Sequence, residues 1–491
     1  MQLRGRWGRW LAGAAMIMAP HAGHAETLRE ALVAAYTTNP DLAAARATQR
    51  ATDENVPIAR AQALPSLQGS VSYSHSIEKP AYGAADFYPS DTVQANTSLN
   101  IPLYAGGGTR SAIDAAKLRV KQGQANLRGT EIGVFSSVVA AYLDVTLDTA
   151  IVALNRNNVQ VLEVNLKATS DRFEIGDVTR TDVAQSNSRL AQGRASLRNA
   201  ESNLIAAREH YIQVVGHAPG ALETPPPLAG LPQTPEAAVQ FALDANPDLI
   251  AARLATKAAG YDVRTADASR LPKIAAVGST SYSNYLGTLP AQAILIGSTP
   301  HVGTAQVGLQ ATIPLYQGGL PSAQIRQAQA NEGAADEHEI AVEREVISTV
   351  RADFAAWKAA NDAIALNETA IAAARLSLEG VRAENTVGNR TILNILDAEQ
   401  ELVNAEVNLV TARRNAYVAG FNLLAAMGKA QAKDLALDED LGAALYDPQV
   451  HYDRDAGDAN DWHRDPERPR QSTPTDTTPA QDATVPPRPQ P

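Results

Sequence analysis

The 491-residue chain has 42 Lys and Arg against 53 Asp and Glu, a formal net charge of −11, and it contains no cysteine. The absence of cysteine excludes disulfides, iron–sulfur clusters, cysteine-ligated zinc, a thiol nucleophile and an acylated N-terminal cysteine. The acidic balance argues against a general nucleic-acid-binding protein, which would carry a basic surface. Only 5% of the residues are aromatic, which is few for a chain with several compact cores.

The first 25 residues have the pattern of a secretory signal peptide. Three arginines precede a short apolar stretch from Leu11 to Ala19, and small residues up to Ala25 form a cleavage site. The apolar stretch is too short to span a bilayer as a helix. We expect no membrane-spanning helix beyond Glu26, so the mature protein should be periplasmic, secreted, or inserted in an outer membrane as strands.

The same series of motifs occurs twice along the mature chain, which indicates an internal duplication. The motif at 39–42, Asn-Pro-Asp-Leu, recurs at 246–249, and the motif at 101–104, Ile-Pro-Leu-Tyr, recurs at 313–316. Each copy of the second motif continues with one residue and two glycines. In each Asn-Pro-Asp motif we expect an N-cap, a proline at the first helical position and an acid in the first turn.

Between Asn-Pro-Asp and Ile-Pro-Leu-Tyr, apolar residues alternate with uncharged polar residues. This alternation predicts β-hairpins at 67–104 and 273–316, with Leu67, Val71 and Tyr73 on one face and serines on the other. Strands of about 9–11 residues match a tilted transmembrane strand. Four strands cannot close a barrel in lipid, so membrane-spanning strands would require two or three chains to share one barrel. A soluble β-domain with one face in water is the alternative.

Proline is excluded from two long tracts, at 103–218 and at 322–447. An interior proline costs a helix about 3 kcal/mol, so such tracts favour very long helices. Apolar residues recur at every seventh position from Val138 to Leu166 and again from Val350 to Leu378. This spacing is typical of a coiled-coil seam, with a core stripe in a large helical bundle as the alternative.

The chain has a signal peptide, two tandem repeats, and strands that end in Ile-Pro-Leu-Tyr, one residue and two glycines before a proline-free tract. In these features it resembles TolC-type outer-membrane efflux proteins. The most specific matches are Ile313–Gly319 and Val387–Thr391, followed by Leu396–Ala398. The resemblance implies an α+β membrane protein and a homotrimer. Four strands per chain would form a twelve-stranded β-barrel, continued by a long, coiled-coil-like α-helical barrel. It also implies a passive, gated conduit in the outer membrane of a Gram-negative bacterium, extending into the periplasm.

The same resemblance implies the partners. In the family, the channel docks onto a periplasmic adaptor and an inner-membrane transporter, for efflux or type I secretion, and it contacts outer-membrane lipid. The exported substrate would be selected by the transporter, so the sequence of this chain does not indicate it. The alternative is an exported periplasmic coiled-coil adaptor or scaffold protein, which would also be helical, acidic and poor in proline. Adaptors usually carry one helical hairpin, so two full copies favour the channel.

The resemblance also indicates where the periplasmic end closes, through polar links between helices and a ring of acids. The residues expected at the gate are Thr181, Asp182, Asn385 and Arg390. Asp397 is expected to line the pore, with Asn394 at the position of a second pore aspartate. Because Asn385 replaces the gate tyrosine of the family and Asn394 replaces an aspartate, we expect a weaker latch and less cation block than in the family pattern.

No catalytic, cofactor-binding or metal-binding constellation is expected, and the protein is predicted not to be an enzyme. Gly106–Gly108 precedes a predicted helix but lacks the Lys-Ser/Thr of a phosphate-binding loop. The nine histidines are scattered, and none is expected to form an i, i+4 metal-binding pair with an acid. The proline-rich C-terminal segment is expected to be disordered and without a site. The predicted domains are a signal peptide at 1–25, a first repeat at 26–230, a second repeat at 231–446 and a disordered tail at 447–491.

Overall fold

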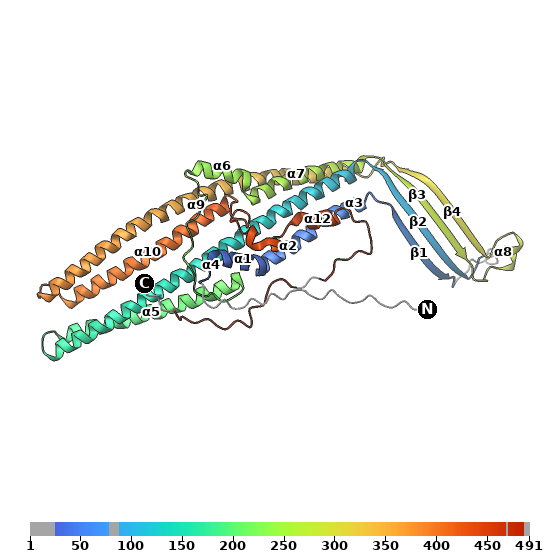
Figure 1. Ribbon diagram of the computed structural model, residues 1–491. Coiled ribbons are helices and arrows are strands. Elements are labelled where there is room, and N and C mark those ends of the chain that lie inside the picture. Colours follow the sequence, from blue (N-terminus) through green and yellow to red (C-terminus); the bar gives the residue numbers. More distant parts are fainter. Residues whose placement is uncertain (1–24, 78–87, 468–469, 486–491) are drawn as a thin grey trace.

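The computed structural model describes residues 25–77, 88–467 and 470–485. The molecule is elongated, with a four-stranded sheet at one end and the turns of two long helical hairpins at the other (Figure 1). Short helices flank the middle of the long ones. The signal peptide, apart from Ala25, lies outside the described residues.

The two repeats share one order of elements: short helices, then two antiparallel strands, then two long helices. In the first repeat these are α1 (Leu28–Thr38), α2 (Pro40–Asp53), α3 (Asn55–Ala61), β1 (Ser66–His75), β2 (Asp91–Ala105), α4 (Gly108–Glu174) and α5 (Arg180–Val215). In the second repeat they are α6 (Pro235–Ala245), α7 (Pro247–Asp267), the 3₁₀ turn η2 (Ala268–Arg270), β3 (Lys273–Asn284), α8 (Ala291–Leu295), β4 (His301–Thr312), α9 (Leu320–Thr386) and α10 (Ile392–Ala426). The chain continues through α11 (Asp438–Leu441), η3 (Gly442–Ala444) and α12 (Pro448–Asp455).

The long helices predicted from the proline-free tracts are confirmed. Helices α4 and α9 each have 67 residues, which corresponds to roughly 100 Å at about 1.5 Å per residue. The seam residues Val138, Val145 and Val152 of α4 are buried, as is Val350 of α9. Seven-residue spacing therefore marks the packed side of both long helices.

Helix α4 also contains an 18-residue window that is apolar enough to cross a membrane by composition, the one such helix in the described part of the chain. The helix is far longer than a membrane span, and it buries Phe135, Val138 and Tyr142 completely. These side chains pack in a core cluster with Tyr36 of α1 and Tyr211 of α5. The apolar composition of α4 is accounted for by this protein core.

The repeated Asn-Pro-Asp-Leu motif joins the beginning of each repeat to its end. The Asn39 Oδ1 accepts from the first N–H groups of α2, while its Nδ2 donates to the Val214 carbonyl of α5 at 3.0 Å. Asn246 caps α7 in the same way and donates to the Ala426 carbonyl of α10 at 2.9 Å. One asparagine thus satisfies orphan groups at two helix ends, which explains its place in both repeats.

A prediction concerns Gly428, which follows α10 at this junction with φ 77°. A Cβ at Gly428 would lie 2.4 Å from the Ala245 carbonyl oxygen, whereas one at Gly319 (φ 85°) would meet nothing within 4 Å. We expect Gly319→Ala to cost about 1–2 kcal/mol from the left-handed backbone alone. Gly428→Ala should cost clearly more, because the backbone must also shift. Thermal unfolding of the two purified variants measures the difference, and equal melting temperatures would contradict a steric role.

The four strands form one antiparallel sheet in the order β1-β2-β3-β4, so the pairing of β2 with β3 joins the two repeats. The register divides the sheet into two faces. One transverse row contains Leu67, Leu99, Gly278 and Val307, and the next row, on the opposite face, contains Gln68, Ser98, Ser279 and Gln306. The predicted apolar face and uncharged polar face are therefore both present.

The outer edges of β1 and β4 have no partner strand among the described residues. Every residue of both edge strands is exposed, including Val71 at 78% and Val307 at 91%. The second hairpin was predicted to run to residue 316, but β4 ends at Thr312. It ends there because Thr312 pairs with Lys273, the first residue of β3.

The predicted disorder of 447–491 is wrong for the beginning of this tail. Residues Pro448–Asp455 form α12, which lies beside α2 and α3 (Figure 1). Tyr452 of α12 packs against an apolar cluster that includes Val56 and Val120. The Arg60 guanidinium also donates to the Ala456 carbonyl at 2.6 Å. These contacts supply burial that the composition of the tail did not indicate.

Candidate functional site

The two helical hairpins end in short turns at the end of the molecule opposite the sheet (Figure 1). The turn at 175–179 connects α4 to α5, and the turn at 387–391 connects α9 to α10. All of the residues predicted for the gate and the acidic ring lie in or close to these turns. The repeat offset of 212 places the two turns at equivalent positions of the repeats.

Asp182 is part of the N-terminal cap of α5, directly after the first of these turns. The Thr179 hydroxyl and backbone N–H donate to Asp182 Oδ2 at 2.7 and 2.8 Å, and the Asp182 N–H donates back to the Thr179 hydroxyl at 3.3 Å. This is a capping box at the start of α5. The same hydrogen bonds from Thr179 lower the pKa of Asp182, so this carboxylate is ionised at neutral pH. Thr181 lies beside it with its side chain exposed.

Asn394 performs the same task in the second repeat. The Thr391 hydroxyl and N–H donate to Asn394 Oδ1 at 2.8 and 3.1 Å, which caps the start of α10. By the repeat offset of 212, Asn394 corresponds to Asp182 and Thr391 corresponds to Thr179. The predicted second pore position is therefore occupied, in this chain, by a capping residue.

Arg390 and Asn385 both stabilise the turn between α9 and α10. The Arg390 Nε donates to Glu384 Oε2 at 2.6 Å, and Asn385 Nδ2 donates to the Arg390 carbonyl at 2.7 Å. About half of each charged side chain of the Arg390–Glu384 pair is exposed. Within the described chain no hydrogen bond or ion pair joins Arg390 to Asp182.

Asp397 forms an ion pair with Arg189, which links α10 of the second repeat to α5 of the first. The Asp397 side chain is 53% exposed and that of Arg189 is 32% exposed. Arg189 was not singled out by sequence, because pairing of α5 with α10 is not evident from either repeat alone. The predicted acidic ring therefore has a basic neighbour in the same chain.

Glu399 is a functional candidate that sequence reasoning missed. Its side chain is only 4% exposed, and it accepts from Asn165 Nδ2 of α4 at 2.8 and 3.0 Å and from Arg382 of α9 at 2.9 Å. It thus joins three long helices close to the turns. The signal was present in the sequence, since Glu399 continues the apolar stripe of Ile392 and Leu396 at the spacing i, i+4, i+7.

Exposed ion pairs also join the two helices of each hairpin, with their signs inverted between the repeats. Glu163 of α4 pairs with Arg194 of α5 at 2.8 Å, and Arg375 of α9 pairs with Glu406 of α10 at 2.8 Å. The repeat offset of 212 places Arg375 at the position of Glu163 and Glu406 at the position of Arg194. Both changes together preserve the attraction.

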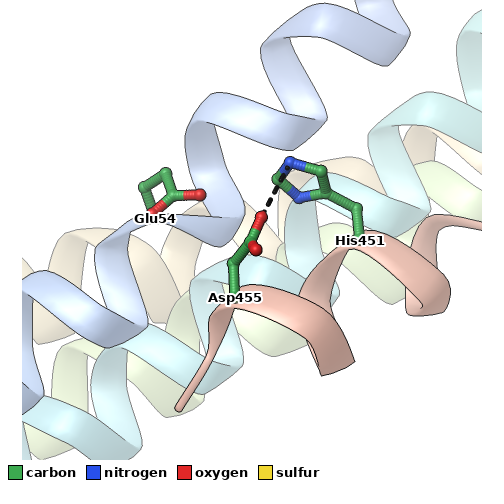
Figure 2. Close-up of side chains that lie close together, drawn as sticks. All are labelled: Glu54, His451 and Asp455. Atoms are coloured by element: carbon green, nitrogen blue, oxygen red, sulfur yellow. Dashed lines mark ion pairs between the residues drawn. The ribbon is translucent and has the colours of Figure 1, made fainter. Parts of the chain in front are cut away.

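No histidine was expected to form an i, i+4 metal-binding pair with an acid, but His451 and Asp455 do form an i, i+4 ion pair. Helix α12 places His451 Nε2 3.2 Å from Asp455 Oδ2, and Figure 2 shows Glu54 beside this pair. The pair was overlooked because the segment was predicted to be disordered, and the i, i+4 spacing brings side chains together only on a helix.

Two stretches of the chain, 31–217 and 238–429, match the family described as outer membrane efflux proteins. The chain belongs to this family. Each matched stretch falls within one predicted repeat, so the duplication extends through the efflux-protein match.

Curated relatives of this efflux protein match it over most of their length. It is 35% identical over 436 residues to the outer membrane efflux protein BepC of Brucella suis, covering 89% of this chain and 92% of BepC. It is 28% identical over 425 residues to the outer membrane protein TolC of Escherichia coli, covering 84% of each chain. It is 25% identical over 449 residues to the alkaline protease secretion protein AprF of Pseudomonas aeruginosa, covering 87% of this chain and 90% of AprF.

Solved structures share the fold of this efflux protein. The outer membrane protein VceC of Vibrio cholerae superimposes with a TM-score of 0.70 at 21% identity, covering 82% of this chain and 96% of VceC. The CmeC outer membrane channel of Campylobacter jejuni gives a TM-score of 0.72 at 16% identity, covering 88% and 89%.

These matches confirm the main predictions. The protein is an outer-membrane efflux and export channel of a Gram-negative bacterium that extends into the periplasm, and each chain contributes strands and long helices to it. The channel interpretation fits the relatives, and the alternative of a periplasmic adaptor does not. The relatives are efflux and secretion proteins rather than enzymes.

Proposed function

We propose that three copies of this efflux protein close a twelve-stranded barrel and form a passive export conduit that is gated at the helical turns. The single observation that carries this proposal is the sheet, in which β1 and β4 leave two fully exposed edges. An open edge is not tolerated in lipid, so β4 of one chain must pair with β1 of the next. This pairing continues the antiparallel alternation, because β1 and β4 run in opposite directions.

The two faces of the sheet indicate how the barrel is oriented. The face with Leu67 and Val307 would contact lipid, and the face with Gln68 and Gln306 would line the pore. The pore face between the strand ends carries amides and hydroxyls rather than charges. An uncharged polar lining has no strong attraction for ions of one sign, which suits a conduit for varied substrates.

A passive conduit needs an external source of energy for export. We infer that a periplasmic adaptor and an inner-membrane transporter supply it, with the helical turns as the end that faces them. This inference is supported by the length of α4 and α9 and by the secretion and efflux roles named for AprF and BepC. Crosslinking in cells followed by co-purification should recover both partners with this chain.

The proposed assembly is tested by the mass and conductance of the purified protein in detergent. We expect a mass of three chains and single-channel currents in planar bilayers. A monomer that stays soluble after detergent removal would overturn the proposal.

We propose that Asp182 and Arg390 latch neighbouring chains at the turns, with Thr181 and Asn385 beside them. A carboxylate has about four acceptor sites and an arginine five N–H donors, so the bonds to Thr179 and Glu384 leave capacity for a partner. Breaking a charge-assisted bond of about 1.5–3 kcal/mol should favour the open state about tenfold or more per chain. We therefore expect Arg390→Ala to raise single-channel conductance in planar bilayers.

The substitution Asp182→Asn distinguishes a role of Asp182 in the latch between chains from a role in capping α5. Asn394 already caps the equivalent helix, so Asp182→Asn should keep the start of α5 intact while removing the charge. A latch predicts higher conductance for Asp182→Asn as well as for Asp182→Ala. If Asp182→Asn conducts like the unmodified channel and only Asp182→Ala is altered, Asp182 is a capping residue alone.

We propose that the Asp397 side chains surround a narrow part of the pore and that Arg189 partly neutralises them. Three carboxylates around one axis attract multivalent cations. Asp397→Ala should therefore weaken inhibition of the current by a trivalent cation, whereas Arg189→Ala should strengthen it. Titration of the cation in planar bilayers measures both variants. Shifts in the same direction would show that the ion pair matters only for holding α5 against α10.

A further inference from the structure

We propose that this protein binds a divalent transition metal ion, of the kind represented by zinc, between the end of α2 and helix α12. The ligands would be Glu54, His451 and Asp455, with Asp465 from the segment after α12. The ion would fasten the C-terminal extension to the helices that lead into the barrel. The residues on the two sides of this site are about 400 positions apart in the sequence, and the site lies away from the gate.

The donor atoms lie close to the spacing that a small cation requires. One ligand atom from each of Glu54, His451 and Asp455 lies within 4.8 Å of the other two (Figure 2). His451 Nε2 is 3.2 Å from Asp455 Oδ2 and 3.8 Å from Asp465 Oδ2. Two ligands of a tetrahedral zinc ion, each bonded at about 2.0–2.2 Å, lie about 3.3–3.6 Å apart. Small side-chain adjustments would therefore complete the site.

A buried carboxylate holds the histidine in the orientation that a metal ligand needs. Asp53 is 2% exposed, and its Oδ2 lies 3.1 Å from His451 Nδ1. Gln49 Nε2 in turn donates to Asp53 Oδ1 at 2.6 Å. Carboxylate, imidazole and metal in series is the usual arrangement around metal-bound histidine, because the carboxylate keeps the proton on Nδ1 and directs the Nε2 lone pair at the ion.

The charge of the cluster also favours a cation. Four carboxylates gather here, from Asp53, Glu54, Asp455 and Asp465. The Arg454 guanidinium donates to Asp455 at 2.5 and 2.6 Å and to Asp465 at 2.8 Å. Arg454 contacts two of these four carboxylates, and each carboxylate oxygen can accept from Arg454 and still face a metal ion. Arg454 would then position the two aspartates as ligands.

Comparison of the two repeats shows that the backbone is altered at this place. In the second repeat α7 is continuous through Tyr261, the residue at the repeat offset of 207 from Glu54. In the first repeat the helix is interrupted at Glu54, where α2 ends and α3 begins. Helix α12 has no counterpart in the first repeat and packs at this interruption. The departure from the duplicated pattern and the ligand cluster thus coincide.

The site is open enough for a metal ion to enter and dry enough to hold it. Asp465 is 39% exposed, whereas His451 is 9% exposed. Helix α3 is followed within a few residues by β1, so an ion here would link the tail to the base of the sheet (Figure 1). We infer a structural site that limits movement of the C-terminal extension.

Calorimetric titration of the detergent-purified, EDTA-treated channel with Zn²⁺ tests this proposal. We expect one zinc ion per chain, and at least tenfold weaker binding in His451→Gln and in Glu54→Gln. Asp53→Asn, which removes the carboxylate that orients the imidazole and its charge, should weaken binding by about 10–100-fold. His338→Gln is the matched control, because His338 is exposed on α9 and far from the cluster along the chain.

A second readout separates loss of metal from loss of fold. Zn²⁺ should protect the segment after α10 from limited proteolysis in the unmodified protein, and EDTA should remove this protection. Asp465→Asn, a change in an exposed segment, should remove the protection while leaving conductance unchanged. The absence of stoichiometric zinc binding, or equal affinity in His451→Gln and the unmodified protein, would overturn the proposal. His451 would then be a buried imidazole hydrogen-bonded between Asp53 and Asp455.

Discussion

Val307→Arg is expected to prevent assembly of the channel in the outer membrane. Val307 lies on the apolar face of edge strand β4 and is 91% exposed in the single chain, so in the proposed barrel it faces lipid. An arginine at the middle of a lipid-facing strand costs about 2–4 kcal/mol, and three chains would each bear this cost. The yield of folded trimer in the outer-membrane fraction, measured by its resistance to SDS without heating, should fall to near zero.

Gln306→Arg is the matched control for this experiment. Gln306 is adjacent in the same strand, but the register places it on the polar face, where its amide donates to Ser279 at 2.9 Å. The arginine would enter the water-filled pore, so the trimer should form at close to the normal yield. Its cation conductance should decrease, because three positive charges line the pore. Equal yields of both variants would contradict the assignment of the two faces.

Glu399→Ala is expected to destabilise the hairpin turns and to raise the resting conductance. The substitution removes the acceptor for Asn165 and Arg382, so α10 loses one buried polar link to α4 and one to α9. Removing one partner of a fully buried ion pair costs about 3–5 kcal/mol. Since the Arg382 side chain is 53% exposed and can be hydrated, we expect a smaller loss of about 1–3 kcal/mol. Thermal unfolding and single-channel recording should show the two effects together.

Glu406→Ala provides the comparison on the same helix. Glu406 also pairs with an arginine of α9, but Arg375 is 64% exposed and the pair lies at the surface. Its loss should change stability by less than about 1 kcal/mol. A double-mutant cycle of Glu399→Ala with Asn165→Ala measures the link to α4 directly. A coupling energy near zero would exclude this link as a constraint on the hairpins.

Much of the fold could be predicted because its signals are periodic. The absence of proline and the seven-residue spacing predicted α4 and α9, and alternation predicted which residues share a face of the sheet. The duplication located both sets of elements from a few landmarks, such as Asn39 and Asn246. These signals depend on neighbours along the chain, which a sequence displays directly.

The candidate site was less accessible to sequence because its contacts join separate elements. The pairing of Asp397 with Arg189 requires α5 to lie beside α10, and no local sequence pattern predicts this packing. The resemblance placed Asn394 at a pore position but gave no sign that Asn394 also caps α10 through hydrogen bonds from Thr391. Helix α12 was missed because composition averages over a segment, and the few apolar side chains that hold it, such as Tyr452, are diluted by proline and acid.

The sign inversion between the pairs Glu163–Arg194 and Arg375–Glu406 bears on how the chain avoids misfolding. After duplication, two nearly equivalent hairpins could exchange their returning helices while the chain folds. Exchange of α5 with α10 would place Glu406 opposite Glu163 and Arg194 opposite Arg375, so both mispaired hairpins would be repelled. The compensated charge reversal therefore disfavours exchange of the two returning helices, by about 1 kcal/mol or less per pair.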